Sequence, residues 1–195
     1  MVTGDSAVGK TSIVQQFLNS GAAFPKNYSM TLSADILTRT INIPESQDTV
    51  ELIIVDCSGK EINNDIIKKV IKSRERNVLI RSPLFQLTEG CSLIMSVFDV
   101  TRDESLAAAK TWIETVREWS EVTNMPGVII GNKTDLTERR SVPAKVGLDT
   151  ATALKVQYLE CSAKDNVGVE DPFFYLANEF HKLHADQAST MAHIA

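Results

Sequence analysis

The chain has 195 residues, a hydrophobic content of 43% and a formal net charge of −5, which suit one domain with a full hydrophobic core. The acidic balance argues against a general nucleic-acid-binding protein, because such proteins need a basic face. Three cysteines, odd in number and widely spaced, favour a reducing, cytoplasmic compartment over a disulfide framework.

Targeting signals are not visible in this sequence. No apolar run reaches the length of a membrane span, and the first residues do not form a basic segment that leads into an apolar one. The last residues hold no cysteine that could be prenylated. We therefore expect neither a membrane span nor a direct lipid anchor.

The stretch 4–11, Gly-Asp-Ser-Ala-Val-Gly-Lys-Thr, fits the pattern G-x-x-x-x-G-K-[ST] of a phosphate-binding loop. Backbone N–H groups of such a loop surround a polyphosphate, and the helix that follows points its positive end at it. Lys10 is expected to reach the β- and γ-phosphates, and Thr11 to offer its hydroxyl to Mg²⁺. The expected binding residues are Gly4, Asp5, Ser6, Ala7, Val8, Gly9, Lys10 and Thr11. Alone, the loop leaves the base and the reaction open.

Hydrophobic periodicity predicts strands that alternate with helices along most of the chain, which is typical of a doubly wound α/β fold. The expected strands are 34–43, 50–56, 92–100, 127–131 and 157–160. The expected helices are 12–18, 62–71, one after a capping box at Thr101–Glu104, 144–155, and one that begins at Asp171 and carries an apolar stripe to Leu183. Only residues 1–3 precede the phosphate loop, so the first strand is expected to be largely missing, since strands usually have roughly 5–6 residues.

Three further motifs lie at the ends of expected strands, where ligands bind in such folds. Asp56 and Gly59 belong to an Asp-Cys-Ser-Gly segment, in which the carboxylate could hold Mg²⁺ through water and the glycine N–H could meet a γ-phosphate. The last motif, Cys161-Ser162-Ala163-Lys164, is expected to aim the Ala163 N–H at guanine O6, with Ser162 shaping the turn.

The segment Asn132-Lys133-Thr134-Asp135 is expected to select the base. Guanine presents N1–H and its 2-amino group side by side, and the Asp135 carboxylate can accept both. Adenine offers an acceptor at N1 and would leave buried polar groups unpaired, which is heavily penalised. Asn132 is expected to hold the loops together near the base, and the stem of Lys133 to cover the face of the ring.

These four elements, with Thr31 at the end of the segment Tyr28-Ser29-Met30-Thr31, resemble the Ras-superfamily small GTPases of the Rab type over nearly the whole chain. The resemblance implies the α/β fold of P-loop NTPases, with a mostly parallel sheet, one antiparallel strand and helices on both faces. It implies GTP/GDP and Mg²⁺ as ligands. Thr11 and Thr31 are then the metal-ligating residues, and Thr31 binds only when a γ-phosphate is present, which makes the loop a switch.

The same resemblance implies one G domain over 1–185, with a segment at 72–90 that has no counterpart in the family pattern. A flexible tail is expected at 186–195. The 72–90 segment is either a partner-binding loop or extra sequence.

A narrower resemblance, to the Rab-like GTPases of intraflagellar transport complex B, rests on Lys60 and on the segments 128–136 and 172–183. It implies a cytosolic and ciliary protein, present at the basal body, that pairs with a small β-sandwich subunit and other subunits of that complex. Lys60 stands where most of these GTPases have a catalytic glutamine. Lysine cannot accept a proton from the attacking water while positioning it, so slow hydrolysis is expected.

Three alternatives stay open. The chain could be an ordinary Rab-like vesicle-trafficking GTPase, or a product that binds nucleotide poorly because of its short first strand and the 72–90 segment. An ATP-dependent P-loop enzyme is a more distant alternative, which Asn132 and Asp135 oppose.

Overall fold

The computed structural model describes residues 1–21, 31, 34–44, 46–59, 88, 90–120, 122 and 124–192, with side chains as far as Ala185. Lys60, the expected helix at 62–71, the segment Tyr28–Met30 and nearly all of 72–90 lie outside the described residues. The strands are β1 Val2–Gly4, β2 Ala34–Asn42, β3 Thr49–Cys57, β4 Ile94–Asp99, β5 Gly127–Asn132 and β6 Gln157–Glu160. The helices are α1 Lys10–Leu18, α5 Asp103–Trp119, α6 Ala144–Leu154 and α7 Asp171–Ala192, with a short 3₁₀ turn η2 at Thr137–Arg139.

The strands form one six-stranded sheet in the order β2-β3-β1-β4-β5-β6. β2 and β3 are antiparallel, and every other pair is parallel. The predicted α/β architecture, with a mostly parallel sheet and one antiparallel strand, is confirmed. β4 and β5 are buried along their whole length, as central strands covered on both faces must be.

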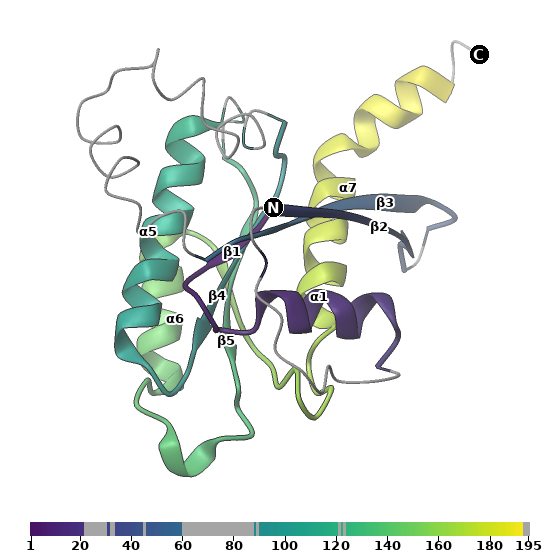
Figure 1. Cartoon of the computed structure of the whole chain (residues 1–195). Helices are drawn as coiled ribbons and strands as arrows, with labels where there is room; N and C mark the ends of the chain where they lie inside the picture. The colour runs from purple at the N-terminus through teal and green to yellow at the C-terminus, as the bar shows by residue number, and fades with distance from the viewer. Residues whose placement is uncertain are drawn as a thin grey trace.

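Helices cover the two faces of the sheet, α5 and α6 on one side and α1 and α7 on the other (Figure 1). The first layer packs Trp112 and Ile113 of α5 against the sheet. In the second layer, Phe17 of α1 stacks on Phe173 of α7 with ring centroids 3.8 Å apart. This double-sided packing leaves the carboxyl ends of the parallel strands as the edge where loops can meet.

The first strand is short but central. β1 has three residues, as residues 1–3 ahead of the loop led us to expect, and all three pair with β4, from Val2 with Met95 to Gly4 with Val97. Val2 also pairs with Asp56 of β3. The phosphate loop therefore leaves the sheet from between β3 and β4.

Two local predictions need correction. The capping box does not form, because the Thr101 hydroxyl donates to Asp99, at 2.7 Å, and α5 begins after Arg102 without a side-chain cap. The apolar stripe of the last helix ends before Leu183, which is 59% exposed. α7 continues to Ala192, because residues 185–192 hold no glycine or proline to end it, and the flexibility of the tail at 186–195 stays a prediction.

Candidate nucleotide-binding site

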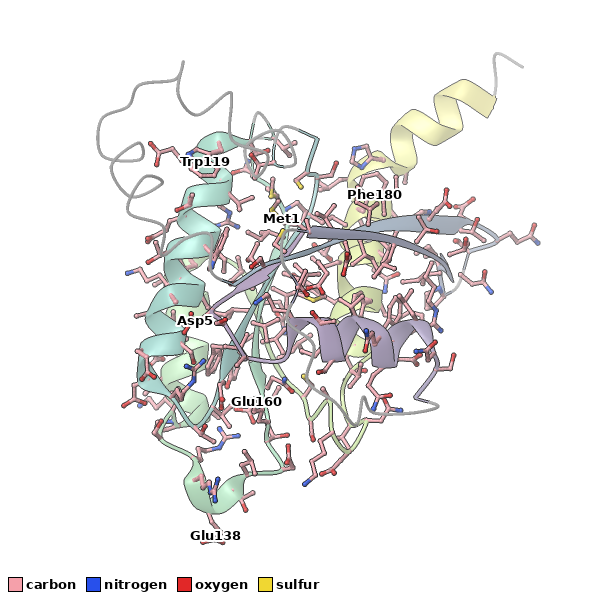
Figure 2. The ribbon with its side chains drawn as sticks, in the orientation of Figure 1. Met1, Asp5, Trp119, Glu138, Glu160 and Phe180 are labelled. Atoms are coloured by element: carbon pink, nitrogen blue, oxygen red, sulfur yellow. The ribbon has the colours of Figure 1, made fainter. Side chains whose placement is uncertain are left out.

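Four segments that lie far apart in the sequence meet beyond the carboxyl ends of the strands. The phosphate loop follows β1, the Asp56–Gly59 segment ends β3, Asn132–Asp135 ends β5 and Cys161–Lys164 follows β6. Figure 2 shows Asp5 in the loop between β1 and α1, on the side that faces α5. The structure thus brings together the predicted site residues that it describes.

Lys10 is fixed inside the phosphate loop. Its side chain is buried, and its ammonium donates to the carbonyl oxygens of Gly4, at 3.0 Å, and Asp5, at 2.8 Å. Burial lowers the pKa of Lys10, although the nearby Asp56 carboxylate opposes this shift. Gly9 adopts φ +99 just before α1, a left-handed conformation that glycine tolerates, and a side chain there would collide with the Asn132 amide.

Oxygen atoms suited to a hard cation lie beside this lysine. The Thr11 hydroxyl donates to Asp56 Oδ2 at 2.5 Å and lies 2.9 Å from the Thr31 hydroxyl. The other carboxylate oxygen of Asp56, Oδ1, is buried and has no hydrogen-bond partner within the described parts of the chain. Burial raises the pKa of Asp56, while the Thr11 hydrogen bond and Lys10 act against that rise. An orphaned carboxylate oxygen beside two hydroxyls fits Mg²⁺, which prefers oxygen ligands and keeps water in its shell.

Gly59 touches the phosphate loop directly. A Cβ at this position would lie 2.5 Å from the Asp5 carbonyl carbon and from the Ser6 nitrogen, so no larger residue fits without a backbone shift. The end of the Asp56–Gly59 segment is therefore placed against the loop that is expected to hold the phosphates.

A cavity of about 400 Å³ opens on the other side of the loop. It is lined by Ala7 and Gly9 of the phosphate loop, by Asn132, Lys133 and Asp135, and by Ala163 and Lys164. The Asp135 carboxylate is only 8% exposed and is held by the Ser162 hydroxyl at 2.9 Å and by the Lys164 ammonium at 3.5 Å. A partly covered acceptor pair in a preformed cavity suits a flat heterocycle with adjacent N–H donors.

Asn132 and Lys133 join this cavity to the phosphate loop. The buried Asn132 amide donates to the Val8 carbonyl at 2.8 Å, and its oxygen accepts the Ala163 N–H at 3.1 Å. The Lys133 ammonium donates to the Ala7 carbonyl, also at 2.8 Å. The expected role of Asn132 in holding the loops together agrees with these contacts. The Ala163 N–H, predicted to meet guanine O6, is bonded here to Asn132 instead.

Sequence reasoning missed Asp99, the last residue of β4. Its carboxylate accepts hydrogen bonds from Lys133 at 2.6 Å and from the Thr101 N–H at 2.9 Å. Burial opposes ionisation of Asp99, but the bonds from Lys133 and Thr101 outweigh it and hold its pKa below the usual value. A signal was available, because Asp99 ends a buried strand just as Asn132 does, and Asp56 is the next-to-last residue of β3.

An ion pair supports the Cys161–Lys164 turn from outside. Glu160, at the end of β6, accepts two hydrogen bonds from the Arg140 guanidinium, at 2.9 and 2.7 Å, and a third from the Tyr158 hydroxyl at 2.5 Å. The hydrogen bonds from Arg140 have the largest effect on the pKa of Glu160. Together with the bond from Tyr158 they lower it below 4.5. Both charged side chains are about a quarter exposed, at 24% and 26%.

Replacing Arg140 by methionine is expected to lower the free energy of unfolding at pH 7 by about 1–3 kcal/mol, because Glu160 loses charge-assisted hydrogen bonds. The sign follows from the lowered pKa: the stabilisation is complete above 4.5 and disappears as the pH falls through the folded-state pKa. Urea unfolding at stepwise lower pH measures the difference. Arg139→Met, at the exposed neighbour, is the control. A loss that persists unchanged at acid pH would contradict this assignment.

None of the helices in the described ranges combines the length and the apolar character of a membrane-spanning segment.

Comparison with known proteins places these features in a family. Residues 1–182 match the Ras family. The chain is 34% identical over 187 residues to an intraflagellar transport protein 27 homolog of Bos taurus, which covers 96% of this chain and 91% of that protein. The Homo sapiens homolog is 33% identical over 195 residues, 100% of this chain and 96% of that protein. Ras-related protein RabC of Dictyostelium discoideum is 29% identical over 179 residues, 92% of this chain and 81% of that protein. The resemblance noted in the sequence is confirmed, and the chain belongs to the Ras family of small GTPases.

Proposed function

We propose that the chain is a GTP-binding switch of the Rab-like type, with slow intrinsic hydrolysis, and that it acts as a subunit or adaptor in intraflagellar transport. The observation that supports the nucleotide assignment is the cavity lined by the Asp135 carboxylate, which can accept hydrogen bonds from a base. Asn132 connects this cavity to the phosphate loop through its hydrogen bond to Val8. Membership of a family that binds and hydrolyses guanine nucleotides supports the same assignment.

Different residues are proposed to bind the base, the phosphates and the metal. Asp135 accepts from the base, Lys10 neutralises the phosphates, and the amides of residues 4–9 surround them. Thr11 and Thr31 would hold Mg²⁺ directly and Asp56 through water, and the metal would supply positive charge that offsets the charge of the phosphates. Thr31 and Gly59 are the residues proposed to sense the γ-phosphate, and their two segments are the proposed switch.

Slow hydrolysis is proposed from the identity of Lys60 alone, which lies outside the described residues. A lysine ammonium donates hydrogen bonds but cannot accept one, whereas a glutamine amide does both. The attacking water therefore loses the acceptor that would align it. A protein of this kind would stay in the GTP-bound form long enough to serve as an adaptor.

Lys60→Gln is expected to increase the single-turnover rate of GTP hydrolysis by at least about tenfold, within the range that a positioned acceptor contributes. The measurement is phosphate release from protein preloaded with GTP and Mg²⁺. Lys60→Met is the matched variant, since it removes the ammonium without adding an amide. If glutamine and methionine give equal rates, the missing acceptor is not the cause of slow turnover.

The transport role is proposed from the relatives. Two of them carry the name intraflagellar transport protein 27 homolog and match nearly the whole chain. The proposed partners are a small β-sandwich subunit and other subunits of intraflagellar transport complex B, and the proposed location is the cytoplasm, the cilium and the basal body. The similarity to RabC favours a second candidate, a Rab-like vesicle-trafficking GTPase.

Analysis of the nucleotide that co-purifies with the chain tests the first step. GTP or GDP that co-purifies with the protein supports both candidate functions. A protein that neither contains nor takes up guanine nucleotide would refute both. Affinity purification of the chain from ciliated cells then separates them. Recovery of transport-complex subunits supports the first candidate, and recovery of vesicle proteins alone supports the second.

A further inference from the structure

Arg102, directly before α5, reaches the phosphate loop from 96 positions away in the sequence. Its guanidinium donates to the Ser6 carbonyl at 2.9 Å and lies 3.5 Å from Asp5 Oδ2. The same group lies 3.7 Å from the Asp99 carboxylate and 3.8 Å from the more exposed Glu104. One side chain therefore contacts two consecutive residues of the loop, one through its backbone and one through its charge.

Asp5 places a negative charge inside the loop that is proposed to hold a polyanion. Its Oδ1 accepts the Ser6 N–H at 2.7 Å, which fixes the orientation of the carboxylate, and its side chain is only 16% exposed. Repulsion between this carboxylate and bound phosphates grows with the charge of the nucleotide. Arg102 is the cation beside Oδ2 of Asp5, whereas Lys10 contacts the backbone carbonyl of the same residue.

Arg102 also fixes the direction of a backbone amide. In a trans peptide the C=O and N–H groups point in opposite directions, so a cation that holds the Ser6 carbonyl turns the Ala7 N–H the other way. Lys133 does the same one residue later by holding the Ala7 carbonyl, which turns the Val8 N–H. Both cations contact the carboxylate of Asp99. Two successive amides of the loop are thus oriented from one buried carboxylate.

We propose that Arg102 is a positioning residue that allows the phosphate loop to hold a triphosphate, because it compensates the charge of Asp5 and orients the Ala7 amide. This inference rests on the proposed guanine-nucleotide site. Arg102 acts through the loop and not on the reacting phosphate, since its contacts are with the carbonyl side of Ser6 and with carboxylates. Its effect is therefore on nucleotide affinity, and it is larger for GTP than for GDP.

The test is a double-mutant cycle between Arg102 and Asp5, read as affinity for GDP and for a non-hydrolysable GTP analogue. Arg102→Ala is expected to weaken binding of the GTP analogue about tenfold, within the usual coupling of neighbouring charges, and binding of GDP by less. Asp5→Asn keeps an acceptor for the Ser6 N–H but removes the charge. In a chain that already carries Asp5→Asn, Arg102→Ala is therefore expected to cost the GTP analogue no more than it costs GDP.

Controls keep the result specific. Lys110→Ala removes an exposed cation from α5, the helix that Arg102 precedes, and is expected to leave both affinities unchanged. Arg102→Ala is expected to keep the preference for GDP over inosine diphosphate, because Arg102 does not line the cavity around Asp135. Thermal unfolding of each variant without nucleotide shows whether it is folded.

Two results would overturn the inference. The first is an Arg102→Ala variant with wild-type affinities for both nucleotides. The second is an equal loss for GTP analogue and GDP that Asp5→Asn leaves in place, which would mark Arg102 as a purely structural contact. A wild-type chain that binds neither nucleotide would instead refute the proposed function.

Discussion

Replacing Asp135 by alanine is expected to weaken GDP binding by about 10²–10⁴-fold, the largest effect that any single change in the base cavity should have. The carboxylate is proposed to accept guanine N1–H and the 2-amino group together, and each charge-assisted hydrogen bond is worth about 1.5–3 kcal/mol. Ser162 and Lys164 already orient the carboxylate, so little order has to be gained on binding. Titration with a fluorescent GDP analogue measures the change.

Asp135→Asn tests the same contact by changing its pattern. The amide keeps one acceptor and gains donors, which fits a base with a carbonyl at C2 better than one with an amino group there. We therefore expect this variant to prefer xanthosine diphosphate to GDP, with the order reversed in the unchanged protein. Equal affinity of wild type and Asp135→Ala for GDP would remove the base assignment altogether.

Lys10→Met is expected to weaken GDP and GTP binding by at least about 100-fold, since charge-assisted contacts to phosphate oxygens contribute about 1.5–3 kcal/mol each. The nucleotide-free protein should respond very differently. Burial lowers the pKa of Lys10, which shows that removing its ammonium from water costs folding free energy. Methionine fills a similar volume without this desolvation cost. The free energy of unfolding without nucleotide should therefore change by no more than about 1–2 kcal/mol.

Thermal unfolding with and without GDP separates these two effects. The wild type is expected to unfold at a higher temperature when GDP is present, because a ligand that binds only the folded state stabilises it. Lys10→Met should lose this increase, whereas Lys145→Met, the same change on the exposed face of α6, should retain it. A Lys10→Met protein that GDP still stabilises fully would show that Lys10 does not contact the phosphates.

Local patterns in the sequence predicted the elements of this fold and the segments of its site. The phosphate loop, Asp56–Gly59, Asn132–Asp135 and Cys161–Lys164 could each be placed at a strand end, because strands and motifs are both short-range features. The strands expected at 34–43 and 50–56, which form the antiparallel pair β2 and β3, could be predicted for the same reason.

Features that depend on contacts across the sheet could not be predicted in this way. The capping box failed for a local reason instead: Thr101 and Glu104 have the required spacing, but the Thr101 hydroxyl donates to Asp99, two residues earlier, and the motif alone does not show which of the two contacts forms. Arg102 reaches Ser6 only because β4 pairs with β1, a neighbour relation that the order of elements along the chain does not state. The stripe on α7 keeps its helical period to Leu183, yet burial there depends on whether another element lies opposite.

The central position of β1 has a consequence for the order in which the chain folds as it is synthesised. β1 emerges from the ribosome well before its two neighbours, at Asp56 and at Met95–Val97. Until β4 is available, the strand that carries the phosphate loop has at most one paired edge, and closing such distant contacts is slow. Asn132 and Ala163, which tie the base cavity to that loop, follow later still. The proposed nucleotide site can therefore be complete only after the turn at 161–164 has been synthesised, so nucleotide binding cannot assist the earlier steps of folding.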